Sequence, residues 1–291
     1  MDAIVNIEGK LFPPDKAFIP IFDHGFLYGD SVYETIRTYD RKPFVLDRHL
    51  DRLFQSADGL SLKSHWNKER WIREISKTIE ACKIKGELYI RTILTRGVGK
   101  IGLDPALCPK PNGIVIVKEL SEAPEGLYTR GMNVRVVSVQ RNDLKALPPY
   151  LKTGNFLNNI LAFIEAKSNG AEEAIMCNAK GEVAEATIAN VFVVKNGSIS
   201  TPPRETGILP GITRGIIEEI CKKDGLPLKA NPILPRALME SDELFLSSTT
   251  REVIPVTICN AKPVGNGKVG PVTRDLHERF KLKVKELMKG V

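Results

Sequence analysis

The sequence lacks paired cysteines, long apolar runs and repeated or low-complexity segments. Its five cysteines lie far apart in 291 residues, so neither a zinc site nor a disulfide framework is expected. No apolar stretch approaches the roughly 20 residues that a membrane helix needs, and the first eight residues lack a basic region followed by an apolar core. We therefore expect a cytoplasmic protein with no metal, leader or membrane segment, and with free, buried thiols.

The charge is unbalanced, but it is not concentrated in one part of the chain. The net charge is +7, while the hydrophobic fraction of 42% and the charged fraction of 26% are ordinary for a globular protein. Nucleic-acid-binding proteins cluster their basic residues, often beside aromatic ones, whereas here they alternate with acidic residues, as in 281–289. A nucleic-acid-binding protein is thus a disfavoured alternative. The length predicts two domains.

The first part of the chain predicts a small α+β domain over residues 1–120. Alternating polar and apolar residues at 31–39, 88–95 and 113–117 predict strands. An apolar stripe at helical spacing between Leu46 and Ala57 predicts a helix that Asp47 caps and Gly59 ends. Residues 121–131 are polar and turn-forming, so we expect a linker there.

The remainder, residues 132–291, predicts a larger domain dominated by sheet. Strands are expected at 134–139, within 174–199, and as one long strand over 243–257. Helices are expected at 156–167, 213–223, 236–240 and 272–288. The two parts together predict an α+β protein with two domains.

Two charged residues of the second part are candidates for catalysis. Lys152 lies in a turn-rich segment between a predicted strand and a helix, and a lysine becomes a nucleophile only where burial or cationic neighbours favour its neutral form. Glu185 lies in an apolar strand, where a buried carboxylate could keep a pyridine nitrogen protonated. A surface lysine and a solvent-facing glutamate are the competing interpretations.

Two further segments have the composition of a phosphate site. Residues 207–214 form a glycine-bounded turn that opens a helix, and free backbone N–H groups at such a point attract anions. Thr213 adds a hydroxyl there. Four consecutive hydroxyl residues at 247–250 interrupt an apolar run and suggest anion recognition, with a plain polar turn as the alternative.

Taken in this order, these segments resemble the class IV aminotransferases, the fold-type IV pyridoxal-phosphate family. That family includes branched-chain and D-amino-acid aminotransferases and aminodeoxychorismate lyase. The resemblance covers nearly the whole chain. Its markers are His-Gly-Phe-Leu-Tyr-Gly-Asp at 24–30, His-Leu-Asp-Arg-Leu at 49–53, the Lys152 segment, Glu185 with Asn190, Leu-Pro-Gly-Ile-Thr-Arg at 209–214, and residues 247–256.

The resemblance implies that pyridoxal 5'-phosphate is carried on a catalytic Lys152. It implies that Glu185 pairs with the ring nitrogen and that Leu209 packs on the ring. The other implied cofactor-binding residues are Arg52, Asn190, Ile212, Thr213, Ser248 and Thr249. The implied fold is a smaller N-terminal α+β domain and a larger C-terminal domain with a β-barrel-like sheet and flanking helices. The cofactor would lie between them, in a homodimer or a higher homo-oligomer.

The substrates implied are small amino acids and 2-oxo acids. Tyr-Ile-Arg at 89–91 and the segment 95–105 resemble branched-chain aminotransferases, so we expect branched-chain L-amino acids with 2-oxoglutarate as acceptor. The implied substrate-binding residues are Tyr28, Tyr33, Tyr89, Arg91 and Thr250.

Three positions depart from the branched-chain pattern. Residues 33–37 and 248–251 resemble D-amino-acid aminotransferases, and Phe156 stands where a tyrosine is common. Because a few pocket residues can invert stereochemical preference, a D-amino-acid aminotransferase is the first alternative. Aminodeoxychorismate lyase is the next, and Arg91 with the loop 102–105 argues against it.

Overall fold

A computed structural model describes residues 3–121, 123–124 and 126–289, and these residues form two compact units. Unit 1 contains the described residues up to 121 together with 151–155, and unit 2 contains 123–150 and 156–289. The boundary expected from sequence assigned Lys152 to the C-terminal domain, whereas its five-residue segment belongs to unit 1. Residues 127–130, within the expected linker, form a short helix.

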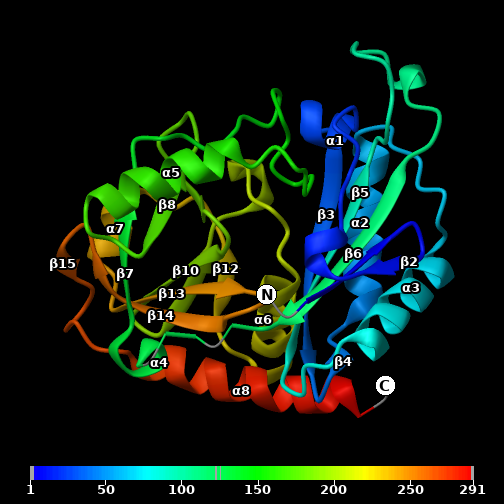
Figure 1. Ribbon diagram of the computed structural model, residues 1–291. Helices are drawn as coiled ribbons and strands as arrows, with labels where there is room; N and C mark the ends of the chain where they lie inside the picture. The colour runs from blue at the N-terminus through cyan, green and yellow to red at the C-terminus, as the bar shows by residue number, and fades with distance from the viewer. Residues whose placement is uncertain (1–2, 122, 125, 290–291) are drawn as a thin grey trace. The chain divides into compact units, whose positions relative to one another are not determined.

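Unit 1 is an antiparallel sheet of six strands in the order β2-β1-β6-β5-β3-β4, with two helices on one face (Figure 1). The strands are β1 (Ala3–Ile7), β2 (Lys10–Phe12), β3 (Ser31–Tyr39), β4 (Lys42–Pro43), β5 (Leu88–Thr95) and β6 (Asn112–Glu119). The helices are α1 (His24–Leu27), α2 (Leu46–Gly59) and α3 (Lys68–Ala81), with short 3-10 turns at Pro14–Lys16 and Pro105–Leu107.

Alternation along the strands decides which side chains of unit 1 enter its core. Val32 and Ile36 of β3 are fully buried in a cluster with Leu50 and Leu53 of α2. Residues at odd positions of β3 point to the opposite face, because successive side chains of a strand alternate. Helix α2 ends at Gly59 as expected, but the capping prediction was wrong. The N-cap is Val45, in a left-handed conformation without a side-chain cap, and Asp47 lies within the first turn.

Unit 2 is built on a nine-stranded sheet in the order β12-β11-β10-β13-β14-β7-β8-β9, with β15 paired to β14. The strands are β7 (Met132–Val136), β8 (Glu173–Cys177), β9 (Val183–Ala186), β10 (Asn190–Lys195), β11 (Ser198–Thr201), β12 (Leu228–Ala230), β13 (Glu243–Ser248), β14 (Glu252–Cys259) and β15 (Lys262–Pro263). The helices are α4 (Leu127–Arg130), α5 (Leu157–Ser168), α6 (Ile212–Asp224), α7 (Pro235–Met239) and α8 (Pro271–Met288), with a 3-10 turn at Arg204–Thr206.

The connection from β9 to β10 forces this sheet to curl. The two strands are five positions apart in the strand order, which in a flat sheet would separate them by about 24 Å. Only residues 187–189 join them, and such a link spans at most about 15 Å. The sheet therefore bends back on itself, which confirms the expected α+β fold with a β-barrel-like sheet in the larger part.

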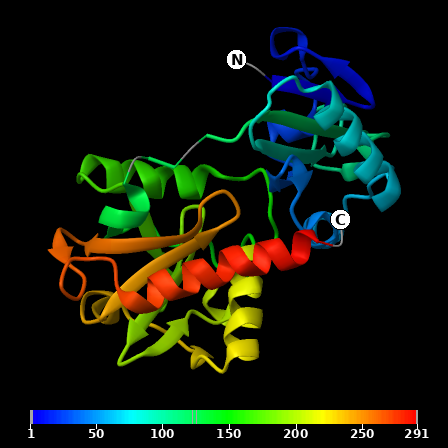
Figure 2. The same cartoon turned by 90° about the horizontal axis from the view of Figure 1, so that it is seen from below.

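Helices cover the outside of this sheet. Helix α5 packs on β8, and α8 packs on β13 and β14 (Figure 1). Helix α6 lies against α8, as the view from below shows (Figure 2). The expectation of one long strand over 243–257 was wrong, because residues 249–251 turn the chain into the antiparallel hairpin β13–β14.

We expect the core of unit 2 to depend on an aromatic pair. The Phe192 and Phe245 rings stack with 4.7 Å between their centroids, and neither side chain is exposed. Phe245→Ala should lower the free energy of unfolding by about 3–5 kcal/mol, because it removes burial and leaves a cavity. Leu282→Ala, at a side chain that is 64% exposed, is the control and should cost less than about 0.5 kcal/mol in the same denaturant titration. Equal costs for the two variants would contradict this assignment of the core.

Candidate functional site

The backbone around Lys152 pairs with the end of β3 that β4 leaves open. The Tyr33 amide donates to the Lys152 carbonyl at 3.0 Å, and the Gly154 amide donates to the Ser31 carbonyl at 2.8 Å. On its other side, the Lys152 amide donates to Ser56 Oγ of α2 at 3.1 Å. Hydrogen bonds to a strand and a helix therefore fix the segment that carries the candidate nucleophile.

The Lys152 side chain lies over an aromatic ring. Its Nζ is 4.5 Å from the centroid of the Tyr33 ring, and the Arg91 guanidinium carbon is 4.0 Å from the same centroid. Burial raises the pKa of Tyr33 to about 12, against the opposing effect of the Arg91 charge, so its hydroxyl stays protonated near neutral pH. The ring thus brings an amine and a guanidinium together beside a neutral hydroxyl.

A buried ion pair lies on the opposite face of β3. Arg52 of α2 donates to both oxygens of Glu34, from Nε at 2.6 Å and from Nη2 at 2.8 Å. His49 Nδ1 lies 2.7 Å from the same carboxylate, and neither Glu34 nor His49 is exposed. Burial alone would raise the pKa of Glu34, but the charge and hydrogen bonds of Arg52, with the hydrogen bond of His49, lower it to about 2. Burial lowers the pKa of His49.

We expect this cluster to make the protein sensitive to acid. Because the pKa of Glu34 in the folded state is below its ordinary value of 4.5, its stabilising contribution is complete above pH 4.5 and is lost as the pH falls toward 2. Between pH 5 and pH 2 the unfolding free energy of the wild type should therefore fall by about 3 kcal/mol more than that of Glu34→Gln. Chemical denaturation at several pH values measures both slopes. Parallel slopes would contradict this role.

In unit 2 the other candidate carboxylate accepts several hydrogen bonds. Glu185 Oε1 accepts from Arg141 Nε at 2.9 Å, and both side chains are nearly buried. Glu185 Oε2 accepts from the Leu209 amide at 2.9 Å and from Asn190 Nδ2 at 3.4 Å. Donors around a carboxylate stabilise its ionised form. The arrangement is suited to holding a negative charge against a cationic ring nitrogen.

The segment around Leu209 is held by the same asparagine. Asn190 Nδ2 also donates to the Leu209 carbonyl at 2.9 Å. Gly211 packs closely on this side chain, since a Cβ at Gly211 would lie 2.1 Å from Asn190 Oδ1. Gly211 is the N-cap of α6 and provides no side-chain cap, so the amides at Ile212 and Thr213 are available to an anion. Asn190 therefore links the carboxylate to the helix terminus.

The hydroxyl cluster predicted from sequence lies at the β13–β14 hairpin. Ser247 and Ser248 end β13, and Thr249 and Thr250 begin the turn. The Oγ atoms of Ser247 and Ser248 are buried, and neither has a hydrogen-bond partner within the described part of the chain. Buried hydroxyls without partners are costly unless a ligand satisfies them. The donor set therefore fits a phosphate, which accepts several hydrogen bonds.

The predicted substrate residues of unit 1 lie on the sheet face that carries Lys152. Tyr33 of β3 and Arg91 of β5 are in contact, and Tyr89 Oη is 3.4 Å from Thr35 Oγ1. Tyr28 follows α1, and its hydroxyl accepts from the Gly102 amide at 3.3 Å. The remaining predicted substrate residue, Thr250, is in unit 2. Lys152 and Arg52 are in unit 1, whereas the other predicted cofactor residues are in unit 2.

Three residues with evident roles at these groups were missed. Arg141 holds Glu185, while Glu34 and His49 surround Arg52. Glu34 faces the core from an alternating strand, and an acid at a core position was the available indication of a buried ion pair. Nothing in the sequence pattern paired Arg141 with Glu185, which is 44 residues away.

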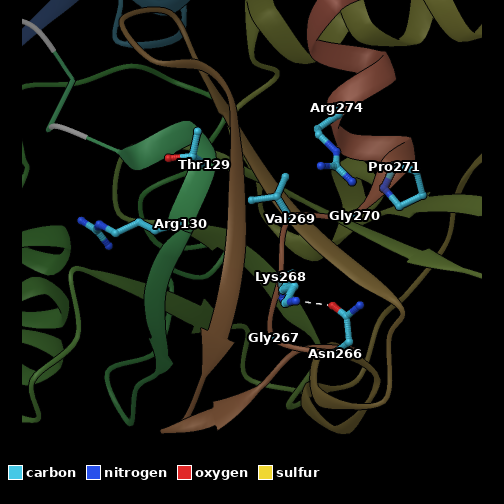
Figure 3. Close-up of a pocket in the computed structure, with 9 residues that line it drawn as sticks. All are labelled: Thr129, Arg130, Asn266, Gly267, Lys268, Val269, Gly270, Pro271 and Arg274. Carbon is cyan, nitrogen blue, oxygen red and sulfur yellow. Dashed lines mark hydrogen bonds between the residues drawn. The ribbon is translucent and has the colours of Figure 1, made fainter.

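A separate cavity lies at the start of α8 (Figure 3). It is lined by Thr129, Arg130, Asn266, Gly267, Lys268, Val269, Gly270, Pro271 and Arg274. None of the residues proposed from sequence lines it. Arg130 there is paired with Glu172 at 2.6 Å. Among the described residues, no group of three or more His, Cys, Asp or Glu side chains could hold a metal ion, and no helix is long and apolar enough to cross a membrane.

Comparison with known proteins identifies the family. Residues 31–259 match the model of the amino-transferase class IV family, and the chain belongs to this family. A Methanocaldococcus jannaschii protein named as a branched-chain-amino-acid aminotransferase is 38% identical over 95% of this chain and 95% of its own length. A D-alanine aminotransferase of Listeria monocytogenes is 33% identical over 95% of this chain and 94% of its own.

Solved structures agree with this assignment. The branched-chain aminotransferase of Thermoproteus uzoniensis, solved with norvaline, superposes with a TM-score of 0.90 at 30% identity, over 97% of this chain and 94% of that one. A branched-chain amino acid aminotransferase of T.th., solved with pyridoxamine 5'-phosphate, gives a TM-score of 0.91 at 28% identity, over 97% and 93%. The family resemblance stated from sequence is therefore confirmed.

Proposed function

We propose that this chain is a pyridoxal-phosphate-dependent transaminase that moves an amino group between branched-chain L-amino acids and 2-oxoglutarate. The observation that carries the proposal is the set of donors around Glu185, from Arg141, Asn190 and the Leu209 amide. A carboxylate held ionised in this way suits one partner above others, a protonated pyridine nitrogen. Family membership supports the same reaction.

Each unit contributes one group of the proposed cofactor ligands. Unit 1 contributes Lys152, which holds the cofactor covalently, and Arg52, which binds its phosphate. Unit 2 contributes Glu185 at the ring nitrogen, with Asn190 supporting it, and Leu209 against the ring. The proposed phosphate ligands of unit 2 are Ile212, Thr213, Ser248 and Thr249. The uncapped start of α6 and the buried Ser248 hydroxyl support this assignment.

The chemistry follows from what these residues hold. When bound, the cofactor supplies a protonated ring that withdraws electrons from a substrate carbon. Glu185 keeps the proton on the ring nitrogen. The Lys152 amine, released when the substrate amino group replaces it, removes the proton from the substrate Cα and returns one to the cofactor side. Hydrogen bonds from its own backbone keep Lys152 in place during both transfers.

The substrate proposal uses the face of β3 and β5. Tyr28, Tyr33, Tyr89 and Thr250 are the proposed contacts for the amino acid, and Arg91 is the proposed partner for the second carboxylate of glutamate. The two branched-chain enzymes of known structure named above support an L-amino acid. The second candidate is a D-amino-acid aminotransferase, which the Listeria relative and residues 248–251 favour.

We also propose a cytoplasmic homodimer. All five cysteines are unpaired, which is typical of a reducing compartment. Unit 1 exposes a group of large apolar side chains on two segments that contact each other, since the Gly99 amide donates to the Phe22 carbonyl. They are Phe18, Ile21, Phe22, Phe26, Ile101 and Leu103. An apolar group of this size on a soluble chain is typical of a protein interface, and a second copy is the partner that family resemblance implies.

Replacing the proposed nucleophile tests the cofactor assignment. Lys152→Ala should lower kcat by at least about 10²-fold, because it removes the general base. Borohydride reduction of the loaded protein followed by mass spectrometry should label Lys152 in the wild type. The exposed Lys145 provides the matched control, and Lys145→Ala should retain both activity and the label at Lys152. Full activity of Lys152→Ala would refute the proposed reaction.

A substrate panel separates the two candidate functions. L-leucine, L-glutamate, D-alanine and D-glutamate are each supplied with a matching 2-oxo acid, and product formation is followed for each pair. We expect kcat/KM to be highest for L-leucine with 2-oxoglutarate, and Arg91→Ala to raise KM for L-glutamate more than for L-leucine, because only glutamate has a second carboxylate. If D-alanine is the best donor, the second candidate is correct and the branched-chain proposal fails.

A further inference from the structure

The hairpin that carries Ser248, Thr249 and Thr250 is tied to two other elements at its far end. Glu252 begins β14 and has a positive φ of 56°, a backbone conformation that a residue other than glycine adopts only at a cost. Such a conformation persists where surrounding contacts impose it. We therefore expect Glu252 and its neighbour Arg251 to be held by contacts from outside the hairpin.

The first contact comes from helix α8. His277 Nε2 lies 2.9 Å from Glu252 Oε2, and both side chains are about nine-tenths buried. Since α8 packs along β13 and β14, this pair fixes the first residue after the turn to a long helix.

The second contact comes from helix α4. The Tyr128 ring stacks on the His277 ring with 4.8 Å between centroids and 28° between planes. The Tyr128 hydroxyl donates to the Arg251 carbonyl at 3.0 Å. Two adjacent residues of the hairpin, Arg251 and Glu252, are thus held by one stacked pair of rings.

The hydroxyls of this hairpin depend on such support. Within the described residues, the buried Oγ atoms of Ser247 and Ser248 have no hydrogen-bond partner, so no protein contact of their own orients them. Their direction is set by the backbone, and the backbone is fixed on the β14 side by Glu252 and Arg251. We propose that Glu252, His277 and Tyr128 are positioning residues that hold the hairpin ready for the cofactor phosphate. This inference rests on the proposed phosphate role of Ser248 and Thr249.

The test compares pyridoxal phosphate with pyridoxal, which lacks the phosphate, in absorbance titrations of the cofactor-free protein. His277→Ala should raise the Kd of pyridoxal phosphate about tenfold and leave the Kd of pyridoxal within about twofold of the wild type. His277→Gln, which can still donate a hydrogen bond to Glu252, should recover most of the loss. Tyr128→Phe removes only the bond to Arg251 and should show the same selectivity with a smaller effect, so it serves if His277→Ala does not fold.

The matched control breaks another ion pair of the same helix. Arg279 of α8 pairs with Asp224 at the end of α6, away from the hairpin, and Arg279→Ala should bind both compounds as the wild type does. The inference is overturned if His277→Ala and Tyr128→Phe keep the wild-type Kd for pyridoxal phosphate, or weaken both compounds equally. If the wild type itself does not prefer the phosphorylated compound, the proposed phosphate site fails and this inference fails with it.

Discussion

Both units depend on a carboxylate that is buried and held by an arginine. A buried carboxylate without donors is strongly unfavourable, so Glu34 and Glu185 constrain everything around them. Glu34 takes two of the hydrogen bonds of Arg52 and fixes the direction of the guanidinium. Glu185 takes Arg141, Asn190 and the Leu209 amide and thereby fixes the segment leading into α6. In each unit, satisfying one charge sets the position of the residues proposed to bind the cofactor.

The scaffolds that present these charges differ. In unit 1 the sheet separates two functions by its alternation, because the even positions of β3 bury Glu34 against α2 while Tyr33 on the other face lies beneath Lys152. In unit 2 the proposed ligands converge through curvature. The short link from β9 to β10 bends the sheet, and Glu185 at one edge strand comes within hydrogen-bond distance of Asn190 five strands away in the strand order. A flat sheet would not allow this contact.

Periodicity and motifs predicted most elements of the fold, because local alternation reports which face of a strand or helix is buried. They failed where a long-range partner decides the structure. The pattern predicted a continuing strand through 249–251, where the chain makes a hairpin, since apolar residues alternate on both sides of the turn. The family motifs named Lys152, Glu185 and Arg52, and the computed structure adds the residues that hold them. Arg141 and the His277–Glu252 pair depend on distant parts of the chain meeting, which no local pattern records.

The placement of residues 151–155 has a consequence for synthesis. These residues complete the open end of β3, yet they leave the ribosome only after the first part of unit 2 has been made. Until then the nascent N-terminal sheet has an unprotected edge, which is a known point of aggregation. The reactive lysine is also the last piece added to that sheet. The amine is therefore presented only by a chain that has already been translated past its midpoint.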